Sequence, residues 1–99
     1  MDDTKITVTV RGIEVTIDRR IFNDTRFAMW MQSIQRASQS GDTSGVDVFE
    51  SFDYMRAVFG REQLDGILSA LEVDGITPIA ESIAFFLESV MAAGEQGKN

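Results

Sequence analysis

The stretch Lys5-Ile-Thr-Val-Thr-Val-Arg-Gly-Ile-Glu-Val-Thr-Ile17 decides the fold at the start of this 99-residue chain. Apolar and polar residues alternate on both sides of Arg11-Gly12, a pattern typical of two β-strands joined by a two-residue turn. Such a turn fixes the strand register and gathers apolar side chains on one face, among them Ile6, Val8, Val15 and Ile17. An isolated hairpin is only marginally stable in water, so we expect this face to lie on helices or to meet another subunit.

Four helices are predicted after the hairpin, because apolar residues recur at helical spacing between polar or glycine-containing breaks. Asn23 or Asp24 can cap a first helix of about 15 residues, and Asp47 with Glu50 is typical of a capping box that starts a second. The third helix is expected over residues 61–72. The pair Thr77-Pro78 fits the start of a fourth helix, which we expect to end near residue 93.

The order of these elements predicts the fold class and the domain organisation. We expect an α+β fold, mainly α, in which an N-terminal β-hairpin is followed by a small bundle of about four helices. A single domain is expected over residues 1–99, with the hairpin at 1–18, the helical bundle at 22–94 and a disordered tail at 95–99. Small polar residues and two glycines predict a loop over residues 38–45.

The last helix is expected to bury one apolar stripe. Its members are Ile79, Ile83, Phe86, Leu87 and Val90. Phe85 lies off this stripe and beside Glu81 and Glu88, so we expect a monomer that buries Phe86 to leave Phe85 largely in water. The alternative is that a helix packed on two sides buries both aromatic rings.

Apolar residues outside the predicted stripes are candidates for contacts with other proteins. The candidates for binding another protein are Phe85, Met29, Phe49 and Tyr54. For self-association, the candidates are the hairpin residues Ile6, Val8, Val15 and Ile17, because a two-stranded hairpin has unsupported edges and a face to cover. We therefore expect a homo-oligomer.

The side chains available for catalysis are few. The chain has no cysteine and no histidine, so a thiolate nucleophile, an imidazole base and a Cys/His zinc site are excluded. Its two lysines, Lys5 and Lys98, do not lie in apolar stretches that would lower their pKa. We expect no enzymatic activity, no bound metal and no cofactor.

Charge is distributed unevenly along the chain. The formal net charge is −7, yet residues 1–36 carry a balance of +1 and residues 37–99 a balance of −8. A strongly acidic chain binds duplex DNA poorly, because phosphate neutralisation supplies most of that affinity, so we expect no nucleic-acid partner. The basic end of one subunit could instead meet the acidic end of its neighbour. No apolar run reaches the ~20 residues of a membrane span, and the acidic start does not resemble a signal peptide.

The C-terminal part of the chain carries a resemblance to a known family. Gly60-Arg-Glu-Gln precedes a helical run, and Asp74-Gly75-Ile-Thr-Pro78 opens a last helix rich in Phe and Leu that leads to a Gly/Lys-containing end. This order resembles the short tail assembly chaperones of long-tailed bacteriophages, especially those of actinobacteria. The resemblance covers residues 58–99 closely and the remainder only in layout, and the segment 41–45 has no counterpart in it.

The resemblance implies a binding function without chemistry. Such chaperones bind the tape measure protein, a very long and aggregation-prone helical chain, and keep it soluble until tail tube subunits replace them. It implies a protein of the host cell cytoplasm that is not found in the mature virion. Two other classes remain open from the residues alone, namely a small phage structural or connector protein and an acidic antitoxin-like regulatory binding protein.

Chaperones of this family are usually made in two lengths by a −1 ribosomal frameshift, so the resemblance also implies a longer frameshifted form of this chain as a partner. Gln96-Gly97-Lys98 permits the slip site G-GGA-AAA when it is encoded as CAG, GGA and AAA. We predict those codons, followed by an open −1 frame. Sequencing the gene tests this, and codons that cannot form the slip site, or an early stop in the −1 frame, would exclude the frameshift.

Overall fold

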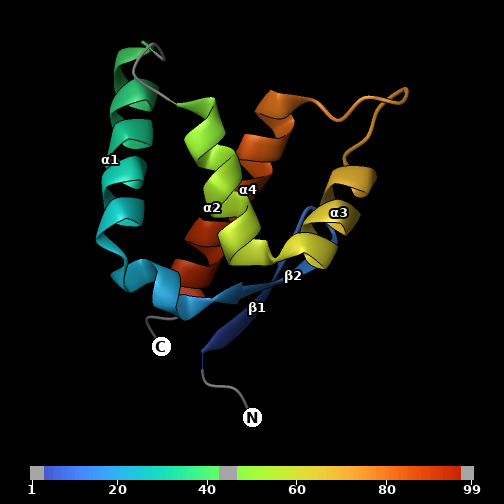
Figure 1. The fold of residues 1–99 in the computed structure, drawn as a ribbon, viewed down its shortest axis with the longest axis horizontal. Helices are drawn as coiled ribbons and strands as arrows, with labels where there is room; N and C mark the ends of the chain where they lie inside the picture. The colour runs from blue at the N-terminus through green and yellow to red at the C-terminus, as the bar shows by residue number, and fades with distance from the viewer. Residues whose placement is uncertain (1–3, 43–46, 97–99) are drawn as a thin grey trace.

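The computed structural model describes residues 4–42 and 47–96, beginning with the expected hairpin (Figure 1). Strands β1 (Lys5–Val10) and β2 (Ile13–Asp18) pair antiparallel in the predicted register, in which Val8 faces Val15. Arg11 and Gly12 both have positive φ, at 52° and 79°, as the two central residues of a type I′ turn require. The twist of this turn matches that of the strands, so the hairpin closes in two residues.

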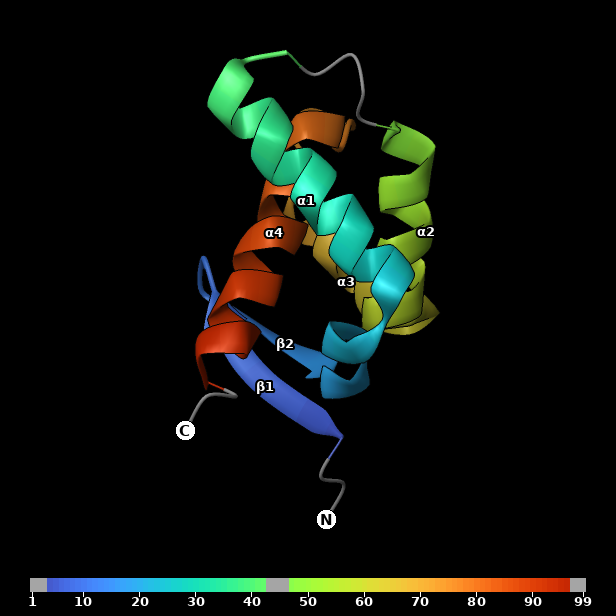
Figure 2. The same ribbon diagram turned by 90° about the vertical axis from the view of Figure 1, so that its left-hand side faces the viewer.

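Within residues 4–42 and 47–96, five helical segments follow the hairpin. They are the 3-10 helix η1 (Arg19–Asn23) and the α-helices α1 (Thr25–Ser40), α2 (Val48–Phe59), α3 (Arg61–Ala70) and α4 (Ile79–Gln96). The four α-helices stand on one side of the hairpin, with α4 crossing behind α2 in Figure 1 and passing behind α1 in Figure 2. The predicted fold class, α+β and mainly α, is confirmed.

Several predicted helix ends are found where the sequence signals place them. The Asp24 carboxylate accepts from the Phe27 N–H at 3.0 Å and caps α1. The Asp47 carboxylate accepts from the N–H groups of Phe49 and Glu50 and caps α2. Gly60, with φ of 79°, ends α2. Helix α1 runs three residues into the predicted loop, and residues 43–45 of that loop lie outside the described part of the chain.

The connection between α3 and α4 differs from the prediction. Helix α3 stops at Ala70, two residues early, because residues 73–76 form a second tight turn closed by a bridge between Val73 and Ile76. Thr77 does not cap α4, since its hydroxyl donates to the Leu68 carbonyl at 2.8 Å and so ties the turn to α3. The Thr77 side chain therefore stabilises the end of one helix instead of the start of the next.

Helix α4 is longer than predicted and includes part of the predicted tail. Gly94 does not end the helix, which continues through Glu95 to Gln96. Residues 97–99 of the predicted disordered tail lie outside the described residues. The Phe22 ring lies 3.8 Å from the place that a Cβ on Gly94 would occupy, so η1 packs closely on this last turn of α4.

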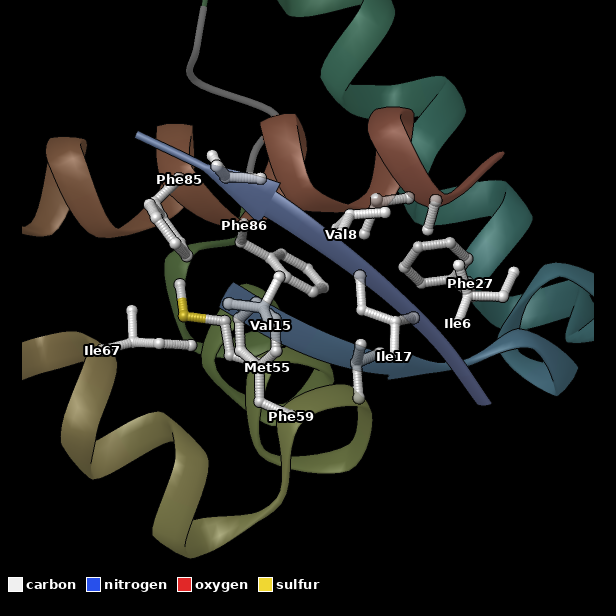
Figure 3. Packing of buried hydrophobic residues seen from close by; sticks show 14 of the residues in the cluster. Ile6, Val8, Val15, Ile17, Phe27, Met55, Phe59, Ile67, Phe85 and Phe86 are labelled. Carbon is white, nitrogen blue, oxygen red and sulfur yellow. The ribbon is translucent and has the colours of Figure 1, made fainter. Parts of the chain in front are cut away.

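The core lies between the hairpin and the helices, and α4 contributes two of its five buried aromatic residues (Figure 3). Phe85 and Phe86 are both fully buried, at 0% exposure. The Phe86 ring lies 5.5 Å from the rings of Trp30 and Phe59, and the Phe85 ring lies 6.4 Å from that of Phe59. The prediction that Phe85 faces water is therefore wrong, and the alternative that α4 is packed on two sides holds.

The buried face of α4 is rotated from the predicted stripe. It consists of Ser82, Phe85, Phe86, Ser89, Val90 and Ala93. The two serines can be buried because their hydroxyls donate to carbonyls four residues back, Ser82 to Pro78 at 2.9 Å and Ser89 to Phe85 at 2.8 Å. Small side chains let the helix approach the strands closely, whereas the Ile83 and Leu87 of the predicted stripe are only half-buried.

We predict that Phe85→Ala lowers the free energy of unfolding by about 3–5 kcal/mol, because it leaves a cavity at a fully buried ring position. Met29→Ala, at a position that is 63% exposed, should change it by no more than about 0.5 kcal/mol. Urea denaturation followed by the fluorescence of the single, buried Trp30 measures both. Equal effects of the two substitutions would contradict the burial of Phe85.

Candidate protein-binding surfaces

The apolar face of the hairpin is covered by the chain's own helices. Val15 and Ile17 are fully buried, while Ile6 and Val8 are 8% and 7% exposed. Figure 3 shows these side chains between α4 on one side and α2 with α3 on the other. The four residues proposed for self-association therefore belong to the monomer's core, and this face is not available to a second subunit.

The outer edge of β2 is also closed. The Gln63 side chain from α3 accepts from the Thr16 N–H and donates to the Thr16 carbonyl, both at 2.8 Å. This amide therefore pairs with β2 as a residue of a third strand would. No sequence signal near residue 63 could have shown this contact, because the two residues are 47 positions apart. Strand addition at β2 is blocked by this contact.

The predicted interaction residues do not gather at one place. Phe85 is buried, and Tyr54 is half-buried with its ring 5.4 Å from that of Phe27. Met29 and Phe49 are exposed as predicted, at 63% and 76%. Met29 lies in the N-terminal half of α1, whereas Phe49 lies in the first turn of α2 and packs on Phe52.

An apolar groove between α1, α4 and the start of α2 was not predicted. It has a volume of about 590 Å³ and is lined by Ile34, Ala37, Ser38, Val48, Ile79, Ala80, Ile83, Ala84 and Leu87. None of the lining residues is charged. Ile79, Ile83 and Leu87 are spaced four residues apart and form one stripe along α4. These are residues that the sequence placed in the core, and the rotation of α4 turns them toward the groove.

The groove exists because α1 packs against the core mainly through its N-terminal half. Phe27 and Trp30 are buried there, and the Trp30 indole N–H donates to the Ser51 hydroxyl of α2 at 3.2 Å. Toward its C-terminal end, α1 diverges from the N-terminal end of α4, as Figure 1 shows. Ile34 is consequently only half-buried and forms one wall of the groove.

Some ionised side chains of the described chain stabilise the fold by contacts that the structure shows. Arg11 in the hairpin turn contacts Glu81 and Glu88 of α4 at 2.8 and 2.6 Å, which holds the turn to the helix and raises the pKa of the guanidinium further. Hydrogen bonds from Arg20 hold the pKa of Asp18 well below its ordinary value. Burial, aided by Glu50, raises the pKa of Tyr54.

Neither a metal site nor a membrane span is found in the part of the chain that the structure describes. Among residues 4–42 and 47–96, no three side chains of the ligand types His, Cys, Asp and Glu lie close enough together to hold a metal ion. No helix in the same ranges is long and apolar enough to cross a membrane.

Comparison of the chain with protein-family models, with curated proteins and with solved structures finds no match. The family resemblance in residues 58–99 therefore stays a prediction from sequence.

We predict that Gln63→Ala lowers the free energy of unfolding by about 1–2 kcal/mol, because it leaves the outward N–H and C=O of Thr16 without their protein partner. Glu62→Ala, at the exposed neighbouring position of α3, should change it by less than about 0.5 kcal/mol. Urea denaturation gives both values. Faster hydrogen exchange of the Thr16 amide in Gln63→Ala alone would locate the effect at the strand edge.

Proposed function

We propose that this chain is a non-catalytic tail assembly chaperone of a bacteriophage or prophage, which holds an apolar helical segment of the tape measure protein in the groove between α1 and α4. The observation that supports this proposal most directly is the stripe of Ile79, Ile83 and Leu87, which lies off the buried face of α4 and lines a groove without charged residues. An aliphatic stripe exposed along a groove is suited to the apolar face of a second helix.

The charge of the chain indicates the chemistry of the client segment. Two of the three elements that form the groove, α2 and α4, belong to residues 37–99, whose charge balance is −8. A client helix with one aliphatic face and lysine or arginine residues beside it would complement both the groove and its acidic surroundings. The same negative charge would keep the complex of chaperone and client dispersed in the host cytoplasm.

The resemblance of residues 58–99 to the chaperones supports the tape measure protein as the client, and the apolar lining of the groove supports this groove as the proposed binding surface. In this proposal the chaperone leaves before the tail is complete, so it is absent from the mature virion. The longer frameshifted form would share the groove and add a second domain that contacts the tape measure protein. A connector protein would instead stay in the particle, and an antitoxin would bind a toxin encoded beside it.

We predict that Ile79→Ser weakens binding of the tape measure protein about fivefold, because Ile79 is 55% exposed in the free chain and its burial by a client contributes roughly 1 kcal/mol. Ile76→Ser is the matched control, since Ile76 is 68% exposed, lies three residues earlier and does not line the groove. Co-expression with the tape measure protein of the same genome, followed by co-purification, measures the soluble complex.

This experiment, together with an analysis of purified virions and of other co-purifying proteins, separates the rival functions. Failure of the wild-type chain to keep the tape measure protein soluble would contradict the chaperone proposal. Equal binding by Ile79→Ser and Ile76→Ser would contradict the groove as its site. Detection of the chain by mass spectrometry in purified virions would favour a connector, and co-purification of a toxin-sized neighbour would favour an antitoxin.

A further inference from the structure

Two tight turns of this chain have nearly the same sequence but opposite surroundings. Residues 10–13 read Val-Arg-Gly-Ile, and residues 73–76 read Val-Asp-Gly-Ile. In both turns the two central residues have positive φ, at 52° and 79° in the first turn and at 53° and 82° in the second. The first turn therefore shows how this chain covers the apolar ends of such a turn.

The first turn is held against the rest of the protein. Val10 is 6% exposed and Ile13 is half-buried. The Arg11 guanidinium donates to Glu81 at 2.8 Å and to Glu88 at 2.6 Å. These two carboxylates lie seven residues apart, and so about two turns apart on one side of α4. The turn thus buries its apolar ends and pairs its charged residue with opposite charges on a helix.

The second turn has the same apolar ends in water. Val73 and Ile76 are 60% and 68% exposed, and in Figure 1 the turn between α3 and α4 projects away from the helices. The two residues are partners in one bridge, so their side chains lie on the same face of the turn. Extended positions favour β-branched residues, yet the exposed positions of β1 carry Thr7 and Thr9. The backbone alone therefore does not require valine and isoleucine here.

Hydrogen bonds hold the second turn in shape without a partner. The Val73 N–H donates to the Ile76 carbonyl at 2.7 Å, and the Ile76 N–H donates to the Val73 carbonyl at 3.0 Å. The Thr77 hydroxyl ties the turn to α3 through the Leu68 carbonyl. A partner would meet an apolar pair that is already in place, so binding would cost little ordering of this segment.

The charges beside the second turn are all negative. From residue 62 to residue 96 the chain has seven carboxylates and no lysine or arginine. Arg11 pairs with two of the seven, in α4. Glu72 and Asp74, on either side of Val73, form no ion pair with any residue in the described ranges 4–42 and 47–96. Such a surface repels nucleic acids and attracts a basic protein surface.

We propose that the turn at residues 73–76 docks on a helix of another protein, one with an apolar stripe bordered by arginine or lysine. Val73 and Ile76 would cover the stripe, while Asp74 and Glu72 would pair with the basic side chains. This is the contact of the first turn with α4, with the charges reversed. Neither Val73 nor Ile76 lines the groove between α1 and α4, so the inference does not depend on the client proposed for that groove.

Two synthetic helices test the proposal in an NMR titration of the full chain. Both carry a leucine stripe and a hydrocarbon staple, and at two border positions spaced as Glu81 and Glu88 are in α4, one has arginine and the other glutamate. We expect the arginine helix to shift the methyl signals of Val73 and Ile76 and to bind there about fivefold more tightly than the glutamate helix. The methyl signal of Ile83 reports separately on the groove. Shifts at Ile83 alone, or equal binding of both helices at the turn, would overturn the proposal.

Reversing the charge of the turn provides the matched variant. Asp74→Arg makes the second turn read as the first does, and Arg11 shows that arginine fits this backbone, so the variant should prefer the glutamate helix. Glu95→Arg changes the net charge equally at the far end of α4 and should keep the wild-type preference. Trp30 fluorescence checks that both variants are folded. An unchanged preference in Asp74→Arg, or the same reversal in Glu95→Arg, would contradict a charge-paired contact at the turn.

A dilution series of the chain alone distinguishes the remaining occupant. We expect the methyl signals of Val73 and Ile76 to stay constant from micromolar to millimolar concentration. Signals that move with concentration would show that a second copy of the chain covers the turn, and would overturn the assignment to a basic helix of another protein.

Discussion

The close packing of α4 against β1 is the contact on which the rest of the structure depends. Phe85 and Phe86 lie side by side in the sequence and are both fully buried, which requires α4 to be covered on two sides. The buried serines at 82 and 89 permit this, because their hydroxyls are satisfied by the helix's own carbonyls and their small size lets the helix approach the strands. Arg11 adds a link at the hairpin turn through Glu81 and Glu88.

The same packing determines which apolar residues stay accessible. Because α4 turns its serines and aromatic rings inward, Ile79, Ile83 and Leu87 line the groove beside α1. Because α1 packs on the core through Phe27 and Trp30, the large buried side chains of this helix come from its N-terminal half. A binding surface therefore arises from the way two helices are anchored, and no reactive side chain is involved in it.

The hairpin, by contrast, has most of its apolar surface buried within the monomer. Its apolar face is covered by helices, and Gln63 occupies the outer edge of β2. The helix cover and the Gln63 contact both hinder strands of other molecules from pairing with this short two-stranded sheet. The exposed apolar residues are found instead on helices and turns, and the groove between α1 and α4 offers contacts made by side chains.

The sequence by itself determined the local structure. Alternation and Arg11-Gly12 set the hairpin register, and Asp24, Asp47 and Gly60 set helix ends, because each signal acts within a few residues of the chain. Helix periodicity also placed Phe27, Trp30 and Phe86 in the core.

Only the tertiary structure decided which way α4 faces. Apolar spacing points toward Ile79, Ile83 and Leu87 as well as Phe86 and Val90, and a count of apolar residues treats serine as an outward residue. The predicted stripe was therefore rotated from the buried face, and Phe85 was wrongly expected to be exposed. The partners that reverse this outcome, β1 and the aromatic rings of α1 and α2, lie some 27 to 80 residues away in the chain. The contact of Gln63 with β2 and the groove could not be predicted from the sequence for the same reason, because long-range contacts leave no local sequence pattern.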